Sequence, residues 1–148
     1  MGTKYKGKNK DISSLDSYIK LIRTVETIKA KISKSLAEFN ISENQFYCMD
    51  AVFHLGLLTQ KELGAKLLRS GGNITLVIDN LEKNNLVKRK KDKKDRRKYF
   101  IKLTTKGEKL YKDIFPIILS LIVDEFNPLS EKEMTELQGY CKKIGKKL

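Results

Sequence analysis

Residues 81–103 read LEKNNLVKRKKDKKDRRKYFIKL, and this stretch determines the kind of fold that the chain can adopt. From Lys83 to Lys98 it contains ten Lys or Arg residues and two Asp residues, a net charge of +8 in sixteen residues. A run of like charge alone is typical of a disordered segment. Here Leu86 precedes the run and the apolar-rich residues 99–103 follow it at strand spacing. We therefore predict the end of a helix followed by two short strands, joined by a cationic loop whose shape suits DNA.

The composition is that of one folded domain with an unusually large positive charge. The chain has 148 residues, a net charge of +13, 40% hydrophobic residues and 33% charged residues, which is too apolar for a disordered protein. Such a charge favours polyanionic partners, with nucleic acid ranked first, an anionic membrane second and an acidic protein third. No signal peptide is expected, because no apolar segment follows the basic residues 4–10. The longest apolar-rich run, residues 114–123, is too short to cross a bilayer, so we expect a cytoplasmic protein without a membrane partner.

Apolar periodicity and capping patterns divide the chain into helices. Residues 1–10 form a basic arm that we expect to be disordered. Apolar residues recur every three or four positions across 12–39, which predicts one long amphipathic helix. Ser42 with Gln45, and Thr59 with Glu62, have the spacing of capping boxes and mark the starts of two further helices. The next helix is predicted to end near Lys83, because Asn84 and Asn85 tolerate the left-handed conformation that ends a helix.

The C-terminal third of the chain is also predicted to be helical. A helix is expected over 105–126, with Pro116 kinking or splitting it. Ser130 and Glu133 form a third capping box, and the apolar residues that follow, at 134, 137, 141, 144 and 148, make a seam that requires a partner helix. The predicted fold is mainly α with a small β-hairpin wing. A winged helix-turn-helix domain at 40–104 is flanked by helical dimerisation regions at 11–39 and 105–148.

The helix over residues 72–83 has a face that suits the major groove of DNA. Its apolar residues centre on one side, and Leu76 lies among polar residues on the other. Leu76 can contact thymine methyl groups, and Asn73 and Asn80 can form two hydrogen bonds with adenine. Asp79 faces the same way, and we expect it to pair with Arg69 or an Arg of the wing. The competing interpretation is a plain solvated surface. The DNA-contacting residues expected here are Arg69, Ser70, Gly72, Asn73, Thr75, Leu76 and Asn80.

The wing is expected to contribute a minor-groove contact. Asp95 and Arg97 are two residues apart, so on an extended strand they share a face, and the carboxylate can orient the guanidinium. An Arg held in this way fits a narrow, electronegative A·T minor groove. The competing interpretation is a solvated charged loop. The wing residues expected to contact DNA are Lys93, Lys94, Asp95, Arg96 and Arg97.

The residues needed for catalysis or for a metal site are not evident. His54 is the single histidine, and the sequence shows neither a nucleophile with its base nor a glycine-rich phosphate loop. Cys48 and Cys141 lie at apolar positions and are expected to be buried, inert thiols. We therefore expect neither an enzyme nor a cofactor or metal site.

Several of these segments together resemble the MarR family of regulators. The resemblance covers nearly the whole chain and is based on LGAKLLRS at 63–70, ITLVIDNLEK at 74–83, LVKR at 86–89, DRR at 95–97 and LTTKG at 103–107. It implies a homodimer whose two winged helices bind a palindromic operator. It also implies repression that a small ligand or an oxidant relieves, and it assigns the minor-groove role to Arg97.

The sequence departs from the family pattern at three places. Asn85 replaces the usual Gly after the recognition helix, and Lys93 and Lys94 replace a Pro-acid turn. The N-terminal region lacks the reactive Cys of the redox-sensing branches, so sensing of that kind is not expected.

The expected partners are double-stranded DNA, a second copy of the chain, and a small aromatic or phenolic effector. The aromatic residues available for an effector pocket could equally belong to the core. They are Tyr18, Phe39, Phe46, Tyr47, Phe53, Tyr111 and Phe115. The alternative function is a winged-helix module that binds protein or RNA and has no specific operator.

Overall fold

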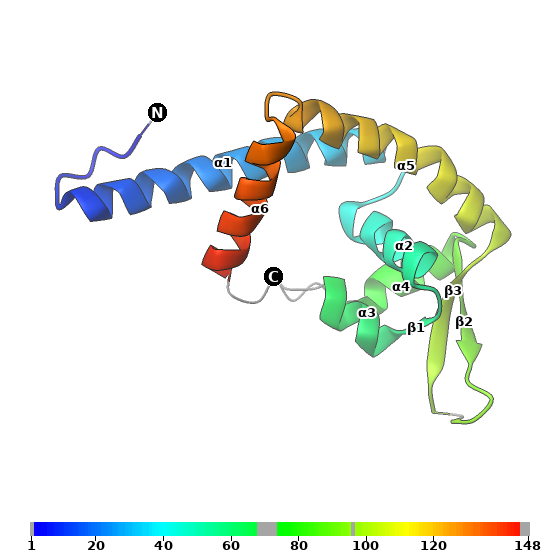
Figure 1. Ribbon diagram of the computed structural model, residues 1–148. Helices are drawn as coiled ribbons and strands as arrows, with labels where there is room; N and C mark the ends of the chain where they lie inside the picture. Colours follow the sequence, from blue (N-terminus) through cyan, green and yellow to red (C-terminus); the bar gives the residue numbers. More distant parts are fainter. Residues whose placement is uncertain (1, 68–73, 96, 146–148) are drawn as a thin grey trace. The chain divides into compact units, whose positions relative to one another are not determined.

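Helices dominate the computed structural model, which describes residues 2–67, 74–95 and 97–145 (Figure 1). The elements are α1 (Asn9–Ala37), α2 (Glu43–Leu55), β1 (Leu58–Thr59), α3 (Gln60–Leu67), α4 (Ile74–Lys83), β2 (Val87–Lys91), β3 (Tyr99–Leu103), α5 (Thr105–Phe126) and α6 (Glu131–Gly145). The predicted fold class, mainly α with a small β-hairpin wing, is confirmed. The described residues of Ile32–Ile117 form one compact unit, and those of Met1–Lys31 and Ile118–Leu148 form another.

The unit Ile32–Ile117 contains the winged helix. Its sheet has the order β1-β3-β2, and both strand pairs are antiparallel. In the hairpin, Val87 is opposite Leu103 and Lys91 is opposite Tyr99. The strand β1 was not predicted, because two residues are too few to show a strand pattern. It pairs Thr59 with Phe100 and so places the start of α3 beside the base of the wing.

The core of this unit consists of side chains at the predicted helix and strand spacing. Five that are completely buried come from five elements, namely Met49, Leu63, Ile78, Ile101 and Ile114. At about 25 cal/mol per Å² of apolar surface removed from water, burying each such side chain contributes roughly 1.5–3 kcal/mol relative to exposure. These contacts hold α2, α3, α4, β3 and α5 together around one core.

The predicted helix ends are confirmed where their caps are described. Ser42 and Gln45 form the reciprocal bonds of a capping box, with the Gln45 N–H donating to Ser42 Oγ over 3.2 Å. The Thr59 N–H donates to Glu62 Oε2 over 2.7 Å, and the Ser130 N–H donates to Glu133 Oε2 over 2.8 Å. Asn85 has φ 58°, which confirms that Asn adopts the left-handed conformation after α4.

Pro116 does not split α5, contrary to that part of the expectation. The helix runs from Thr105 to Phe126 with Pro116 inside it, and the proline is exposed. The missing N–H removes one helical bond. We infer that α5 tolerates this loss because the proline lies on its solvent side, where water can satisfy the carbonyl that loses its donor.

The unit formed by Met1–Lys31 and Ile118–Leu148 exposes much apolar surface. No side chain of α6 is buried within the described chain, and Ile144 is 72% exposed. A hollow of about 790 Å³ is lined by residues of α1 and α6, including Tyr18, Leu21 and Cys141. Lys31 pairs with Glu125 in the same unit. Among the residues that the structure describes, no helix is both long and apolar enough to span a membrane.

Candidate nucleic-acid interface

The two faces of α4 differ in burial as the sequence predicted. Ile78 and Leu81 are completely buried, whereas Leu76 is 57% exposed and Asn80 is also exposed. The helix therefore presents Leu76 and Asn80 outward from a rigid position. Four other residues that were expected to contact DNA, Arg69, Ser70, Gly72 and Asn73, lie outside the described residues.

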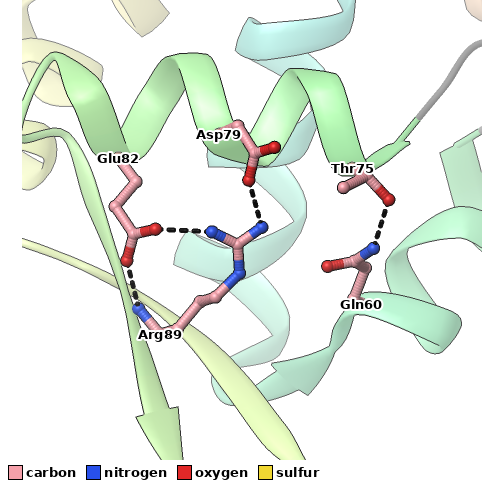
Figure 2. Close-up of polar contacts among 5 residues, drawn as sticks. All are labelled: Gln60, Thr75, Asp79, Glu82 and Arg89. Carbon is pink, nitrogen blue, oxygen red and sulfur yellow. Dashed lines mark hydrogen bonds and ion pairs between the residues drawn. The ribbon is translucent and has the colours of Figure 1, made fainter.

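Arg89 of β2 joins the wing to α4 (Figure 2). Its Nη2 lies 2.5 Å from Asp79 Oδ1 and its Nη1 lies 2.5 Å from Glu82 Oε2, while its backbone N–H donates to Glu82 Oε1 over 3.2 Å. The pairing expected of Asp79 with an Arg of the wing is thereby confirmed. Burial lowers the pKa of Arg89, but the bonds and charges of Asp79 and Glu82 outweigh it and raise the pKa overall. The guanidinium thus stays charged and neutralises carboxylates that would repel phosphate.

Sequence reasoning missed Arg89 as a functional residue. The sequence analysis counted Arg89 only among the cations of the run and did not single it out as the wing residue that pairs with Asp79 and Glu82. The available signal was the pair of acids at Asp79 and Glu82, which are three residues apart and share a helix face. After the turn at Asn85 the chain runs back beside α4 as β2. Arg89, seven residues beyond Glu82, therefore reaches the helix face that carries Asp79 and Glu82.

A second bond connects the starts of α3 and α4 (Figure 2). Gln60 Nε2 donates to Thr75 Oγ1 over 2.6 Å. Thr75, an expected DNA contact, therefore also positions the helix that carries Leu76 and Asn80. Together with the Arg89 bridge, this bond ties α4 to its neighbours near both of its ends.

The tip of the wing brings Asp95 and Arg97 together, but in a turn. Asp95 Oδ1 accepts a hydrogen bond from the Arg97 N–H over 3.0 Å and lies 3.5 Å from Arg97 Nε. The predicted reason, a shared strand face, is wrong, because β3 begins only at Tyr99. The Lys98 N–H donates to the Asp95 carbonyl over 2.9 Å and closes the turn. The Arg97 side chain is 93% exposed, so its guanidinium extends away from the protein.

Of the other three wing residues expected to contact DNA, the structure describes two, Lys93 and Lys94. Lys93 and Lys94 are exposed at the tip, and the Lys94 N–H donates to Asp92 Oδ1 over 2.9 Å. Arg96 lies outside the described residues.

Five of the seven aromatic residues considered for an effector pocket form one cluster. Tyr111 lies at its centre, with ring centroids 4.5 Å from Phe53, 5.5 Å from Phe115 and 5.9 Å from Phe46, which in turn lies 5.8 Å from Tyr47. Phe46 and Tyr111 are buried, so they belong to the core. Phe39 is half-buried in the turn after α1, and Tyr18 belongs to the other compact unit.

The Tyr111 hydroxyl is held by two polar groups of α2. It donates to Asp50 Oδ1 over 2.6 Å, and His54 Nε2 lies 2.9 Å from the Tyr111 hydroxyl oxygen. Burial, together with the bond to Asp50 and its charge, raises the pKa of Tyr111 above its ordinary value. The neutral hydroxyl therefore links α2 to α5.

The two cysteines differ in exposure. Cys48 is completely buried in α2, and burial raises the pKa of its thiol to about 12. A protonated, inaccessible thiol is a poor nucleophile, which agrees with the inert role predicted for it. Cys141 is only half-buried in α6, so it is less sheltered than predicted.

Comparison with known proteins agrees with this geometry. The pattern of the MarR family matches residues 41–99. The HTH-type transcriptional regulator MhqR of Bacillus subtilis (strain 168) is 32% identical over 132 residues, which cover 89% of this chain and 91% of MhqR. The fold resembles AbsC, a MarR family transcriptional regulator from Streptomyces coelicolor, with a TM-score of 0.84 and 19% identity over 96% of this chain and 97% of AbsC.

A solved complex with DNA is also similar. The S. aureus MepR-DNA complex has a TM-score of 0.78 and 28% identity, over 88% of this chain and 98% of that one. The winged helix, the outward face of α4 and the cationic wing suit a protein that binds duplex DNA. The chain therefore belongs to the MarR family and is a DNA-binding transcriptional regulator.

Proposed function

We propose that the protein is a homodimer that binds a palindromic operator through α4 and the wing, and that it represses the promoter containing this operator. The observation that supports this most strongly is the outward face of α4. Leu76 and Asn80 project from a helix whose opposite face is buried and which is tied to Gln60 and Arg89. Repression follows simply from such binding, because a dimer that occupies a promoter excludes polymerase.

The alternative, a module that binds protein or RNA, fits this face less well. Interfaces between proteins are enriched in aromatic residues and depleted of acids. The sequence of α4 contains no aromatic residue, and its exposed positions hold Thr75, Leu76, Asp79, Asn80 and Lys83. An amide beside an aliphatic side chain instead matches the adenine and thymine edges of a major groove.

The exposed apolar side chains of the unit that contains α6 support a dimer. A monomer rarely leaves so many of them in water, and a second copy related by a two-fold axis would cover them. The same axis would place two α4 helices against two half-sites of a palindrome. These side chains are Leu15, Tyr18, Leu21, Ile22, Val25, Leu119, Ile122, Val123, Tyr140 and Ile144.

Removing residues 130–148 is expected to give monomers or aggregates, because it deletes all of α6. Operator affinity should then fall by about 100-fold or more, since the two half-sites are no longer bound by one linked particle. Light scattering after size-exclusion chromatography measures the mass. A matched pair of point variants tests whether the apolar seam itself holds the dimer. Leu137→Asp places a charge on the seam and should weaken the dimer, whereas Gln138→Asp places it on the exposed neighbouring position and should not. A well-folded dimer of the truncated chain would rule out this role for α6.

Arg97→Ala is expected to weaken operator binding about tenfold or more where the wing meets A·T steps. Asp95 orients the guanidinium, so little rotamer entropy is lost when it enters a narrow minor groove. Lys94→Ala is the control, because an exposed Lys is a mobile point charge that contributes about 1 kcal/mol or less. On a duplex with G·C at those steps, Arg97→Ala and Lys94→Ala should lose similar amounts of binding affinity. Equal losses for both variants on both duplexes would mean that the wing is only an electrostatic pad.

We also propose that a small aromatic or phenolic effector relieves repression by binding beside Phe53. A hollow of about 390 Å³ is lined there mainly by apolar side chains, among them Phe53, Leu57 and Leu103, and by the oppositely charged Lys102 and Glu108. A ligand that binds only the folded protein raises its Tm by mass action. Phenols and benzoates should therefore raise the Tm and release DNA in the native protein but not in Phe53→Ala. If no compound both raised the Tm and released DNA, relief of repression by an effector at this position would be excluded.

A further inference from the structure

A hollow that is distinct from the α4 face lies between the start of α3 and the wing. We call it the wing hollow; its volume is about 350 Å³, roughly that of ten water molecules. It exists because the short strand β1 pairs with β3 and so places α3 beside the wing. The residues that line it are Thr59, Gln60, Lys61, Arg89, Arg97, Lys98 and Tyr99.

The lining of the wing hollow is strongly cationic. Four of the seven side chains are Lys or Arg, and none of the described residues that line it is acidic. Arg89 is already bound by Asp79 and Glu82, and Arg97 lies near Asp95. The exposed residues Lys61 and Lys98 therefore supply most of the charge available to a ligand. The hollow is thus suited to an anion.

One acid lies close to this region and is held by a cap. Glu62 Oε2 accepts hydrogen bonds from the Thr59 N–H over 2.7 Å and from the Thr59 hydroxyl over 2.8 Å. These bonds lower the pKa of Glu62, and the charge of Lys98 lowers it further. Because the carboxylate is directed at the start of α3, it does not occupy the wing hollow.

The position of the wing hollow favours one kind of anion, a phosphate of the DNA backbone. Gln60 is bound to Thr75 at the start of α4, and Arg89 is bound to Asp79 in its middle, so the hollow borders the recognition helix. Its lining also includes Arg97, the residue proposed for the minor groove. In duplex DNA, one sugar–phosphate strand separates a major groove from the adjacent minor groove. With α4 in the major groove and Arg97 in the minor groove, as proposed above, that strand would pass between them.

We propose that the wing hollow binds a phosphodiester of the DNA strand that separates the groove read by α4 from the groove entered by Arg97, with Lys61 and Lys98 as its cations. The proposal rests on the proposed function, because it takes the placement of α4 and Arg97 from it. The bound phosphate carries no base information. It fixes the distance between the two reading elements along the duplex.

The test compares Lys61→Gln and Lys98→Gln with Lys109→Gln in the full-length protein. Lys109 is an exposed residue of α5 that does not line the wing hollow, so its replacement removes the same charge elsewhere. Affinity is measured from 0.05 to 0.3 M salt on a selected operator and on a duplex of shuffled sequence. If each native subunit neutralises about four phosphates, log K falls with log salt at a slope near −7 for the dimer. Unchanged Tm values verify folding.

Each of the two hollow variants should flatten the slope by about 2, since a dimer loses two phosphate contacts. It should also weaken binding to both duplexes about 30-fold at 0.15 M salt. Lys109→Gln should leave the slope within about 0.5 of the native value. The proposal is overturned if the hollow variants behave like Lys109→Gln, or if their loss is confined to the operator. If instead the native protein shows no sequence preference while the slopes change as expected, the phosphate contact stands and the operator-specific function fails.

Discussion

Arg89→Met is expected to reduce operator affinity by about 100-fold in a dimer that still folds. The native side chain binds Asp79 and Glu82 at 2.5 Å each, so its loss leaves two carboxylates per subunit unpaired next to DNA. It also removes the side-chain link between the wing and α4, while the backbone bond from residue 89 to Glu82 remains. Truncating one partner of such a charge pair costs about 2–5 kcal/mol at an interface, mainly because the other charge is left unpaired. Fluorescence anisotropy with labelled operator measures the loss.

A rescue variant separates charge repulsion from positioning. Replacing Asp79 with Asn and Glu82 with Gln in the Arg89→Met protein removes the unpaired charges while keeping the side-chain shapes. This triple variant should recover about tenfold or more of the lost affinity, because four negative charges per dimer are removed. Lys90→Met is the control, since it removes the adjacent cation and leaves the bridge intact. Affinity of Arg89→Met within threefold of Lys90→Met would show that the bridge does not matter for binding.

Gly107→Ala is expected to destabilise the fold by about 3 kcal/mol or more. A Cβ at this position would lie 1.9 Å from the Leu86 carbonyl oxygen, which is backbone and cannot rotate away. That oxygen accepts a hydrogen bond from the Thr104 N–H over 3.0 Å at the start of α5. An added methyl group would therefore separate α5 from the start of β2 and break this bond. Overpacking costs about 1–3 kcal/mol, occasionally more, and the lost bond about 1 kcal/mol.

Gly64→Ala is the matched control for that experiment. Its Cβ would lie 3.6 Å from Ile74 Cγ2, an ordinary van der Waals contact within the same unit. Ala in a helix interior is favoured over Gly by about 0.5–1 kcal/mol, so this variant should be neutral or slightly more stable. Urea denaturation measures both variants. A free energy of unfolding for Gly107→Ala within 0.5 kcal/mol of the native value would mean that the backbone shifts at little cost.

The features that the sequence predicted correctly depend on residues close together in the chain. The capping boxes at Ser42 and Thr59 need only contacts three residues apart. The left-handed turn at Asn85 follows from the preference of one residue type. The sidedness of α4 follows from its helical period, which places Ile78 and Leu81 together in the core. Local chemistry and periodicity were therefore sufficient for the fold class.

The features that the sequence did not predict depend on contacts between distant segments or on exact turn geometry. The strand β1 is defined by its pairing with β3, more than forty residues away along the chain. The Arg89 bridge requires the wing to return along α4, and apolar periodicity does not report on such a polar contact. The contact of Asp95 with Arg97 was predicted but assigned to a strand, because the length of the wing turn is not encoded in the alternation of residues.

Whether α4 reads base edges can be decided by one binding experiment. Fragments of genomic DNA are selected with purified protein, and the selected site and a shuffled version of it are then bound by native protein and by Asn80→Ala at 0.15 M salt. We expect the native protein to prefer its selected site by about 1,000-fold or more. Asn80→Ala should lose about 1–3 kcal/mol on that site and nothing on the shuffled duplex. A native preference below about tenfold, or an equal loss on both duplexes, would show that α4 contacts only the DNA backbone.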